Sequence, residues 1–174
     1  MYTFFSSARL LSCALLLCLT LPGPPVRGEA PDPNLAAVTD AFDSLLKLTD
    51  GAVSLQNYQK KLQETEAAVQ KPQTALNDEQ KTLVEKTLGY LRTARDVMQW
   101  RMKHRAKDGN YQYSESDKDL NGWFATYPFL RSAIMEKAPA GGTGLYDPDT
   151  ALTFLWDRAE QAIEELKGEK KEEP

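Results

Sequence analysis

An oxygen-rich hexapeptide, Asp117 to Gly122, comes closest in this sequence to a recognisable binding chemistry. Asp117, Asp119 and Asn121 occupy alternate positions and a glycine follows, as in the first half of an EF-hand calcium loop. Because a hard cation prefers clustered oxygen ligands, this spacing predicts a calcium site. Pro128 stands where such a loop carries its bidentate glutamate, so we expect an affinity of about a millimolar at best.

The same hexapeptide also fits the start of a short helix. In this alternative Ser116 is the N-cap, Asp119 lies in the first turn, and Asn121–Gly122 ends the helix. We favour the helix start over the calcium site, because the glutamate is missing and the preceding residues do not resemble an entering helix.

Positive charge gathers just before this hexapeptide, at Arg101, Lys103, His104, Arg105 and Lys107. In a chain with a net charge of −4, such a cluster could bind an anionic ligand or partner. Cations are also common in the last turn of a helix, where they complement the helix dipole, and here the two arginines could pair with Asp117 or Asp119. The candidate partner or ligand surface comprises these arginines and three nearby aromatic residues: Trp100, Arg101, Arg105, Trp123 and Tyr127.

No combination of residues in the sequence matches a known catalytic machinery. His104 is the only histidine, and both cysteines, Cys13 and Cys18, lie in a predicted leader, which excludes a Cys-His metal centre from the mature chain. The sequence has no Gly-x-Ser-x-Gly motif and no phosphate-binding loop. We therefore predict a protein that is not an enzyme and needs no cofactor, calcium being the one candidate ion.

A short segment, Leu76-Asn77-Asp78-Glu79-Gln80, resembles the Leu-Thr-x-x-Gln signature of the Spy/CpxP periplasmic chaperones, with Asn in place of Thr. That family is exported, poor in cysteine and all-helical, and usually carries a second copy. The nearest second copy here, Leu48 to Ala52, lacks the Gln. The resemblance implies a chaperone-like binding role, although the same residues also make a good helix start.

Apolar residues recur at steps of three and four along most of the chain, which predicts helices over residues 35–49, 55–69, 77–102, 128–138 and 147–166. Residues 120–127 indicate only a short amphipathic turn. Since each helix has one apolar side and most connections are short, we expect an all-α fold, an up-and-down bundle of four to five helices.

The helix over residues 77–102 has the widest apolar face, which should contact two or more neighbouring helices. Its members are Leu83, Val84, Thr87, Leu88, Leu91, Ala94, Val97, Met98 and Met102. Trp100 lies outside this face, and we expect the aromatic segment 111–138 to cover it.

Residues 1–28 have the composition of a cleaved signal peptide: Arg9, an apolar run over 10–21, and small residues before Glu29. The run is too short to span a bilayer. We therefore expect a single helical domain at 29–168, a disordered charged tail at 169–174, a periplasmic or secreted location, and no integral membrane segment in the mature chain. The acidic balance argues against nucleic-acid binding.

Together these features predict an exported, non-enzymatic helical-bundle protein that binds a macromolecular partner, another protein of the periplasm or extracellular space. Its role would be that of an adaptor, an accessory subunit or a chaperone-like factor. The alternative is a bundle that binds a small molecule or, weakly, calcium, with a pocket lined by Trp100, Trp123, Phe124, Tyr127 and Trp156. A cavity at these aromatics would favour the alternative, and an exposed apolar patch would favour the partner-binding role.

Overall fold

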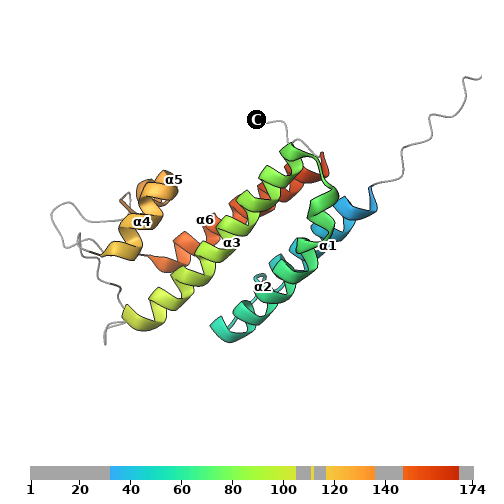
Figure 1. The fold of residues 1–174 in the computed structure, drawn as a ribbon. Coiled ribbons are helices and arrows are strands. Elements are labelled where there is room, and N and C mark those ends of the chain that lie inside the picture. Colours follow the sequence, from blue (N-terminus) through green and yellow to red (C-terminus); the bar gives the residue numbers. More distant parts are fainter. Residues whose placement is uncertain (1–31, 105–110, 112–116, 136–146, 169–174) are drawn as a thin grey trace, which may run out of the picture. The chain divides into compact units, whose positions relative to one another are not determined.

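Six α-helices and one 3₁₀ turn make up the described part of the chain (Figure 1). The computed structural model describes residues 32–104, 111, 117–135 and 147–168, which belong to one compact unit, and of residues 132–135 it describes the backbone alone. The predicted signal peptide and charged tail lie outside these residues. The elements are α1 (Pro33–Leu46), α2 (Leu55–Gln70), η1 (Pro72–Ala75), α3 (Asp78–His104), α4 (Lys118–Thr126), α5 (Pro128–Met135) and α6 (Pro148–Lys167).

The prediction of an all-α chain is confirmed, since the described residues include no β-strand. The predicted count of four to five helices is too low, because Lys118–Thr126 is a helix of 9 residues instead of a short turn. None of the described helices combines the length and the apolarity needed to cross a bilayer.

Side-chain caps fix the starts of α3 and α6. Before α3, the backbone N–H of Gln80 donates to Asn77 Oδ1 at 2.8 Å, and the N–H of Asn77 donates to Gln80 Oε1 at 3.0 Å. This reciprocal pair satisfies two N–H groups that the helix leaves free, so the segment that resembles the chaperone signature forms a capping box here. At the far end of the chain, Asp147 caps α6, and Gly168 ends it with a φ of 79°.

Helices α3 and α6 lie side by side and run in opposite directions (Figure 1). α3 also packs against α2 and η1, so the prediction that its wide face contacts more than one neighbour is confirmed. Seven of the nine predicted face residues are buried, and Leu83 is half-buried. Met102 is 69% exposed, contrary to its assignment to the buried face, because the last turn of α3 borders an open groove instead of a neighbouring helix.

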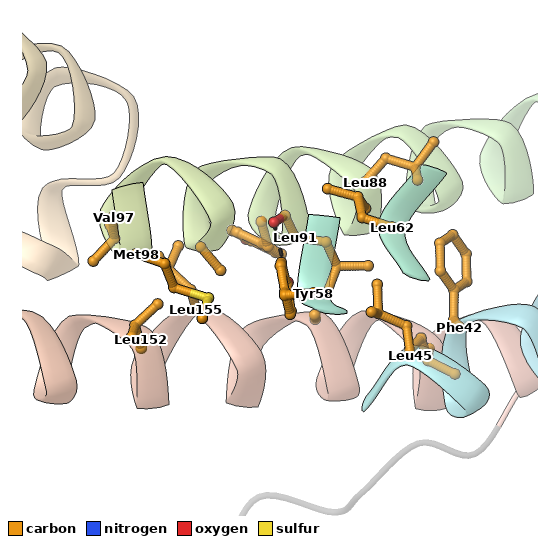
Figure 2. Close-up of a cluster of buried hydrophobic side chains, with 14 of the residues drawn as sticks. Phe42, Leu45, Tyr58, Leu62, Leu88, Leu91, Val97, Met98, Leu152 and Leu155 are labelled. Atoms are coloured by element: carbon orange, nitrogen blue, oxygen red, sulfur yellow. Dashed lines mark hydrogen bonds between the residues drawn. The ribbon is translucent and has the colours of Figure 1, made fainter. Parts of the chain in front are cut away.

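A buried tyrosine forms a polar link within the core next to these helices (Figure 2). The hydroxyl of Tyr58, on α2, donates to the carbonyl of Leu91 at 3.1 Å and accepts from Trp156 Nε1 at 3.4 Å. Burial raises the pKa of Tyr58, so the hydroxyl stays neutral inside the core. Leu45, Leu62 and the other apolar side chains shown in Figure 2 pack around this link.

An aromatic cluster joins the α4–α5 pair to the long helices. The rings of Tyr90 on α3 and Tyr127 lie 5.2 Å apart, and those of Tyr90 and Phe129 lie 6.3 Å apart. The guanidinium of Arg158, on α6, lies 5.4 Å from the centre of the Phe129 ring. The hydroxyl of Tyr127 comes so close to α3 that it lies 3.0 Å from where a Cβ on Gly89 would be. A larger residue at Gly89 would therefore displace Tyr127.

Candidate functional site

Trp100 is 2% exposed, so α3 buries this side chain beside the wide face that the sequence predicts. Its indole Nε1 donates to Asp117 Oδ2 at 2.8 Å, and its ring lies 6.2 Å from that of Tyr111. The expectation that the segment 111–138 covers Trp100 is therefore confirmed for Tyr111 and Asp117. His104 stacks on the same indole with ring centres 4.4 Å apart, while its own side chain faces solvent. Trp100 thus contributes to packing, and offers little surface to a ligand.

Asp117, the first residue of the predicted calcium fragment, is the N-cap of α4. Its Oδ1 accepts from the backbone N–H groups of Asp119 at 3.0 Å and of Leu120 at 3.1 Å. The helix continues to Thr126, so two details of the helix-start alternative are wrong: the cap is not Ser116, and the helix does not end at Asn121–Gly122. Burial of Leu120 outweighs the cost of about 1 kcal/mol that a glycine brings to a helix interior.

The helical backbone also sets the directions in which the side chains of the predicted calcium fragment project. Successive helical residues turn by about 100°, so Asp119 and Asn121 project roughly 200° apart on α4. Asp117 already uses both carboxylate oxygens as hydrogen-bond acceptors. Within the described residues, no group of three or more His, Cys, Asp or Glu side chains is placed to hold a metal ion.

Arg101 pairs with Asp149, a residue that no local sequence pattern connects with it. Its Nη1 forms an ion pair with Asp149 Oδ1 in the first turn of α6, and its Nε donates to the hydroxyl of Tyr111 at 3.1 Å. The hydrogen bond to Tyr111, and next the charge of Asp149, raise the pKa of Arg101. The predicted pairing of Arg101 with Asp117 or Asp119 is wrong, because α6 begins beside the end of α3. Arg105 lies outside the described residues.

The remaining aromatic candidates are half-buried and belong to different contacts. Tyr127 packs on Tyr90, Trp156 lies with its ring centre 6.2 Å from that of Tyr58, and Trp123 packs against the core. Next to Met102 lies an apolar groove whose one aromatic lining residue is Tyr111. None of the five aromatic residues predicted to line a small-molecule pocket lines this groove.

This groove, at the junction of α2 and α3, is the candidate site. It has a volume of about 410 Å³, and its lining is mostly apolar: Val53, Leu55, Met98, Arg101, Met102 and Tyr111. Met98 is 7% exposed, whereas Met102 is 69% exposed at the rim. Sequence periodicity does not reveal the groove, because it places Met98 and Met102 on a helix face turned towards the core. Val53, an apolar residue in the connection before α2, was the one local signal.

A second cleft, of about 340 Å³, lies between α2 and α3 and is polar in character. Its charged lining residues form ion pairs: Glu66 with Arg92 at 2.7 Å, and Arg95 with Asp96 at 2.8 Å. The other residues that line this cleft are Leu62 and three glutamines, Gln59, Gln63 and Gln99. Paired charges and glutamines are ordinary solvated surface, so this cleft is the weaker candidate.

No protein-family model, curated protein or solved structure matches this chain. Its function is therefore inferred from its own residues. The described part of the chain is all-helical and has an open, mostly apolar groove where α2 begins and α3 ends.

Proposed function

We propose that this chain is an exported, non-enzymatic, up-and-down helical bundle that binds another protein through the groove of Val53, Leu55, Met98 and Met102. The observation that carries the proposal is the exposure of Met102, at 69%, directly beside an apolar depression. The partner is a protein of the periplasm or extracellular space, and the role is that of an adaptor, an accessory subunit or a chaperone-like factor.

The physical support comes from how the exposed apolar residues are placed. Among the described residues, the large hydrophobic side chains that are exposed are Met102 and Phe154. A single exposed apolar residue is normal, but Met102 lines a groove, so its surface is continuous with that of other apolar side chains. Methionine is flexible and polarisable, so Met98 and Met102 can adapt to more than one partner side chain.

The proposal that the chain is exported rests on residues 1–28. Arg9, the apolar run and the small residues before Glu29 support a leader that is removed. Edman sequencing of the protein recovered from the exported fraction should give a new N-terminus near Glu29. An intact Met1, or a lipid on Cys13, would contradict export of a free mature chain.

Photo-crosslinking tests the binding role directly. A benzoylphenylalanine at position 102 should give an adduct with a second protein in cells, since position 102 lies at the rim of the groove. The matched control is the same probe at Phe154, which is 39% exposed on α6 and does not line the groove. Adducts of equal yield at both positions, or none at position 102, would reject the groove as the binding surface.

The groove volume supports a second candidate function. About 410 Å³ falls within the range of roughly 300–1,000 Å³ that small-molecule sites occupy. An apolar small molecule with an anionic group near Arg101 would fit this lining. Solvent extraction and mass spectrometry of the purified protein should then find a bound compound that the Met98→Glu variant lacks. Identical extracts from both proteins would remove this candidate.

A further inference from the structure

We propose that Met102 is a site of reversible oxidation by peroxides, and that a sulfoxide at this position lowers the affinity of the groove for the partner protein. The effect on affinity rests on the proposed partner-binding function, whereas the selective oxidation of Met102 does not. Both follow from the different exposure of two methionine side chains that line the same groove.

The thioether of Met102 is open to a small oxidant, and that of Met98 is shielded. Met102 is 69% exposed in the last turn of α3, whereas Met98, about one helical turn earlier, is 7% exposed and belongs to the buried cluster shown in Figure 2. An oxidant must reach the sulfur, so the oxidation of a methionine follows its exposure. The two residues therefore form a matched pair on one helix with opposite expected reactivity.

Methionine is the only sulfur-containing residue of the predicted mature chain. The two cysteines, Cys13 and Cys18, belong to the predicted leader. A cysteine thiolate is a strong nucleophile that would compete for a peroxide, and its removal with the leader ends that competition. Met1 also belongs to the leader, so the methionines left to react are Met98, Met102 and Met135.

The reaction at Met102 is a two-electron oxidation. The sulfur lone pair attacks one oxygen of hydrogen peroxide, and an S–O bond forms as the O–O bond breaks. The departing hydroxide takes the proton of the transferred oxygen and becomes water. The sulfur is thereby oxidised to a sulfoxide and the peroxide is reduced. Methionine sulfoxide reductases reverse the change, with one enzyme for each epimer of the sulfoxide, so the modification is reversible.

A sulfoxide at Met102 changes the groove and leaves the core intact. The flexible apolar side chain becomes polar, and a partner that covers the new oxygen must remove water from it. Because Met102 is exposed, the sulfoxide stays hydrated in the free protein and costs little stability. At Met98 the same oxygen would be buried among apolar side chains and would destabilise the fold.

Limited oxidation of the purified protein tests the selectivity. The protein carries Met135→Leu, and hydrogen peroxide is added until each molecule has gained on average less than one oxygen. Fragment-ion mass spectrometry should locate this oxygen on Met102 about ten-fold more often than on Met98, and urea unfolding should keep its midpoint. In the unfolded protein both methionines should oxidise at equal rates, which controls for intrinsic reactivity. Equal oxidation in the folded protein would overturn the inference.

The effect on partner binding needs a probe that leaves position 102 free. Benzoylphenylalanine at Val53, which also lines the groove, should crosslink the partner, and peroxide should lower the adduct yield several-fold. Met102→Leu is the matched control: leucine keeps the position apolar and has no sulfur, so its adduct yield should survive the peroxide. Met102→Gln places a polar amide at the rim and should lower the yield without any peroxide.

The outcomes separate the oxidation site from the function. With no adduct at position 53 or 102, the proposed partner binding fails and the effect on affinity fails with it, while mass spectrometry alone decides the selectivity for Met102. An adduct yield that peroxide leaves unchanged in the protein with Met102 overturns the effect on affinity. An equal loss of adduct in that protein and in Met102→Leu overturns it too, because the oxidised group then lies elsewhere.

Discussion

The indole Nε1 of Trp100 donates to Asp117 Oδ2 at 2.8 Å, while Oδ1 of the same carboxylate caps the first turn of α4. One carboxylate therefore joins the end of α3 to the beginning of α4. Because Trp100 is buried, loss of Asp117 would remove a hydrogen-bond acceptor from the interior of the protein.

We expect the Asp117→Asn variant to be destabilised by about 1–3 kcal/mol in urea unfolding. An asparagine offers one acceptor oxygen, so it can cap α4 or accept from Trp100, but its amide nitrogen cannot replace the second oxygen. The control is Asp119→Asn, which removes a charge from the first turn of α4 and should cost less than about 1 kcal/mol. Equal losses in the two variants would show that the link to Trp100 contributes nothing.

Packing on the wide face of α3 predicts how three substitutions change the free energy of unfolding. Leu88→Ala and Leu91→Ala should each lower the free energy of unfolding by about 2–5 kcal/mol, because both side chains are buried. Lys103→Ala, on the exposed side of the same helix, should change it by less than about 0.5 kcal/mol. Comparable losses in all three variants would contradict the assignment of the face.

Several features of the fold could be predicted because their signals are local. The Asn77–Gln80 capping box, the Asp147 cap and the glycine that ends α6 depend on residues within a few positions of one another. The buried face of α3 likewise follows from its spacing, because any helix must turn that stripe towards a neighbour.

The features that the sequence did not predict depend on contacts between distant segments. Arg101 pairs with Asp149, 48 positions away, and no local pattern distinguishes that carboxylate from Asp117. Met102 fits the apolar period of α3 as well as Met98 does. It is exposed because the groove lies open at that turn, which is a property of the packed helices and not of the sequence of α3.

The buried hydroxyl of Tyr58 predicts a loss of stability in alkali. Burial raises the pKa of this hydroxyl above its unfolded value near 10, so the folded state binds the proton more tightly than the unfolded state does. The resulting stabilisation is complete below about pH 10 and is lost as the pH rises above it. The pKa of Tyr90 is raised for the same reason, so it contributes in the same direction.

Urea melts between about pH 8 and 11 check the part of this loss that belongs to Tyr58. Tyr58→Phe should start about 1 kcal/mol less stable, since the carbonyl of Leu91 and the indole of Trp156 lose a hydrogen-bond partner. Its stability should then fall less steeply with pH than that of the unmodified protein. The same slope in both proteins would refute the assignment to Tyr58.

Calcium should leave the thermal midpoint unchanged. Both carboxylate oxygens of Asp117 already accept hydrogen bonds, and the helix spreads Asp119 and Asn121 apart. A site with a dissociation constant of about half a millimolar would gain roughly 1.4 kcal/mol at ~5 mM calcium. An upward shift of that size, absent from a variant with both Asp117→Asn and Asp119→Asn, would establish the calcium site instead.

Partner binding is tested most directly by the dissociation constant of the complex between this chain and the partner protein that crosslinks at position 102. Measured by calorimetry, Met102→Glu should weaken the complex by about ten-fold or more, because a carboxylate on the rim of an apolar groove must lose water on binding. Phe154→Glu, the control at the other exposed apolar residue, should leave the constant unchanged, and both variants should melt like the unmodified protein. Equal affinities for all three proteins would contradict a binding role for the groove.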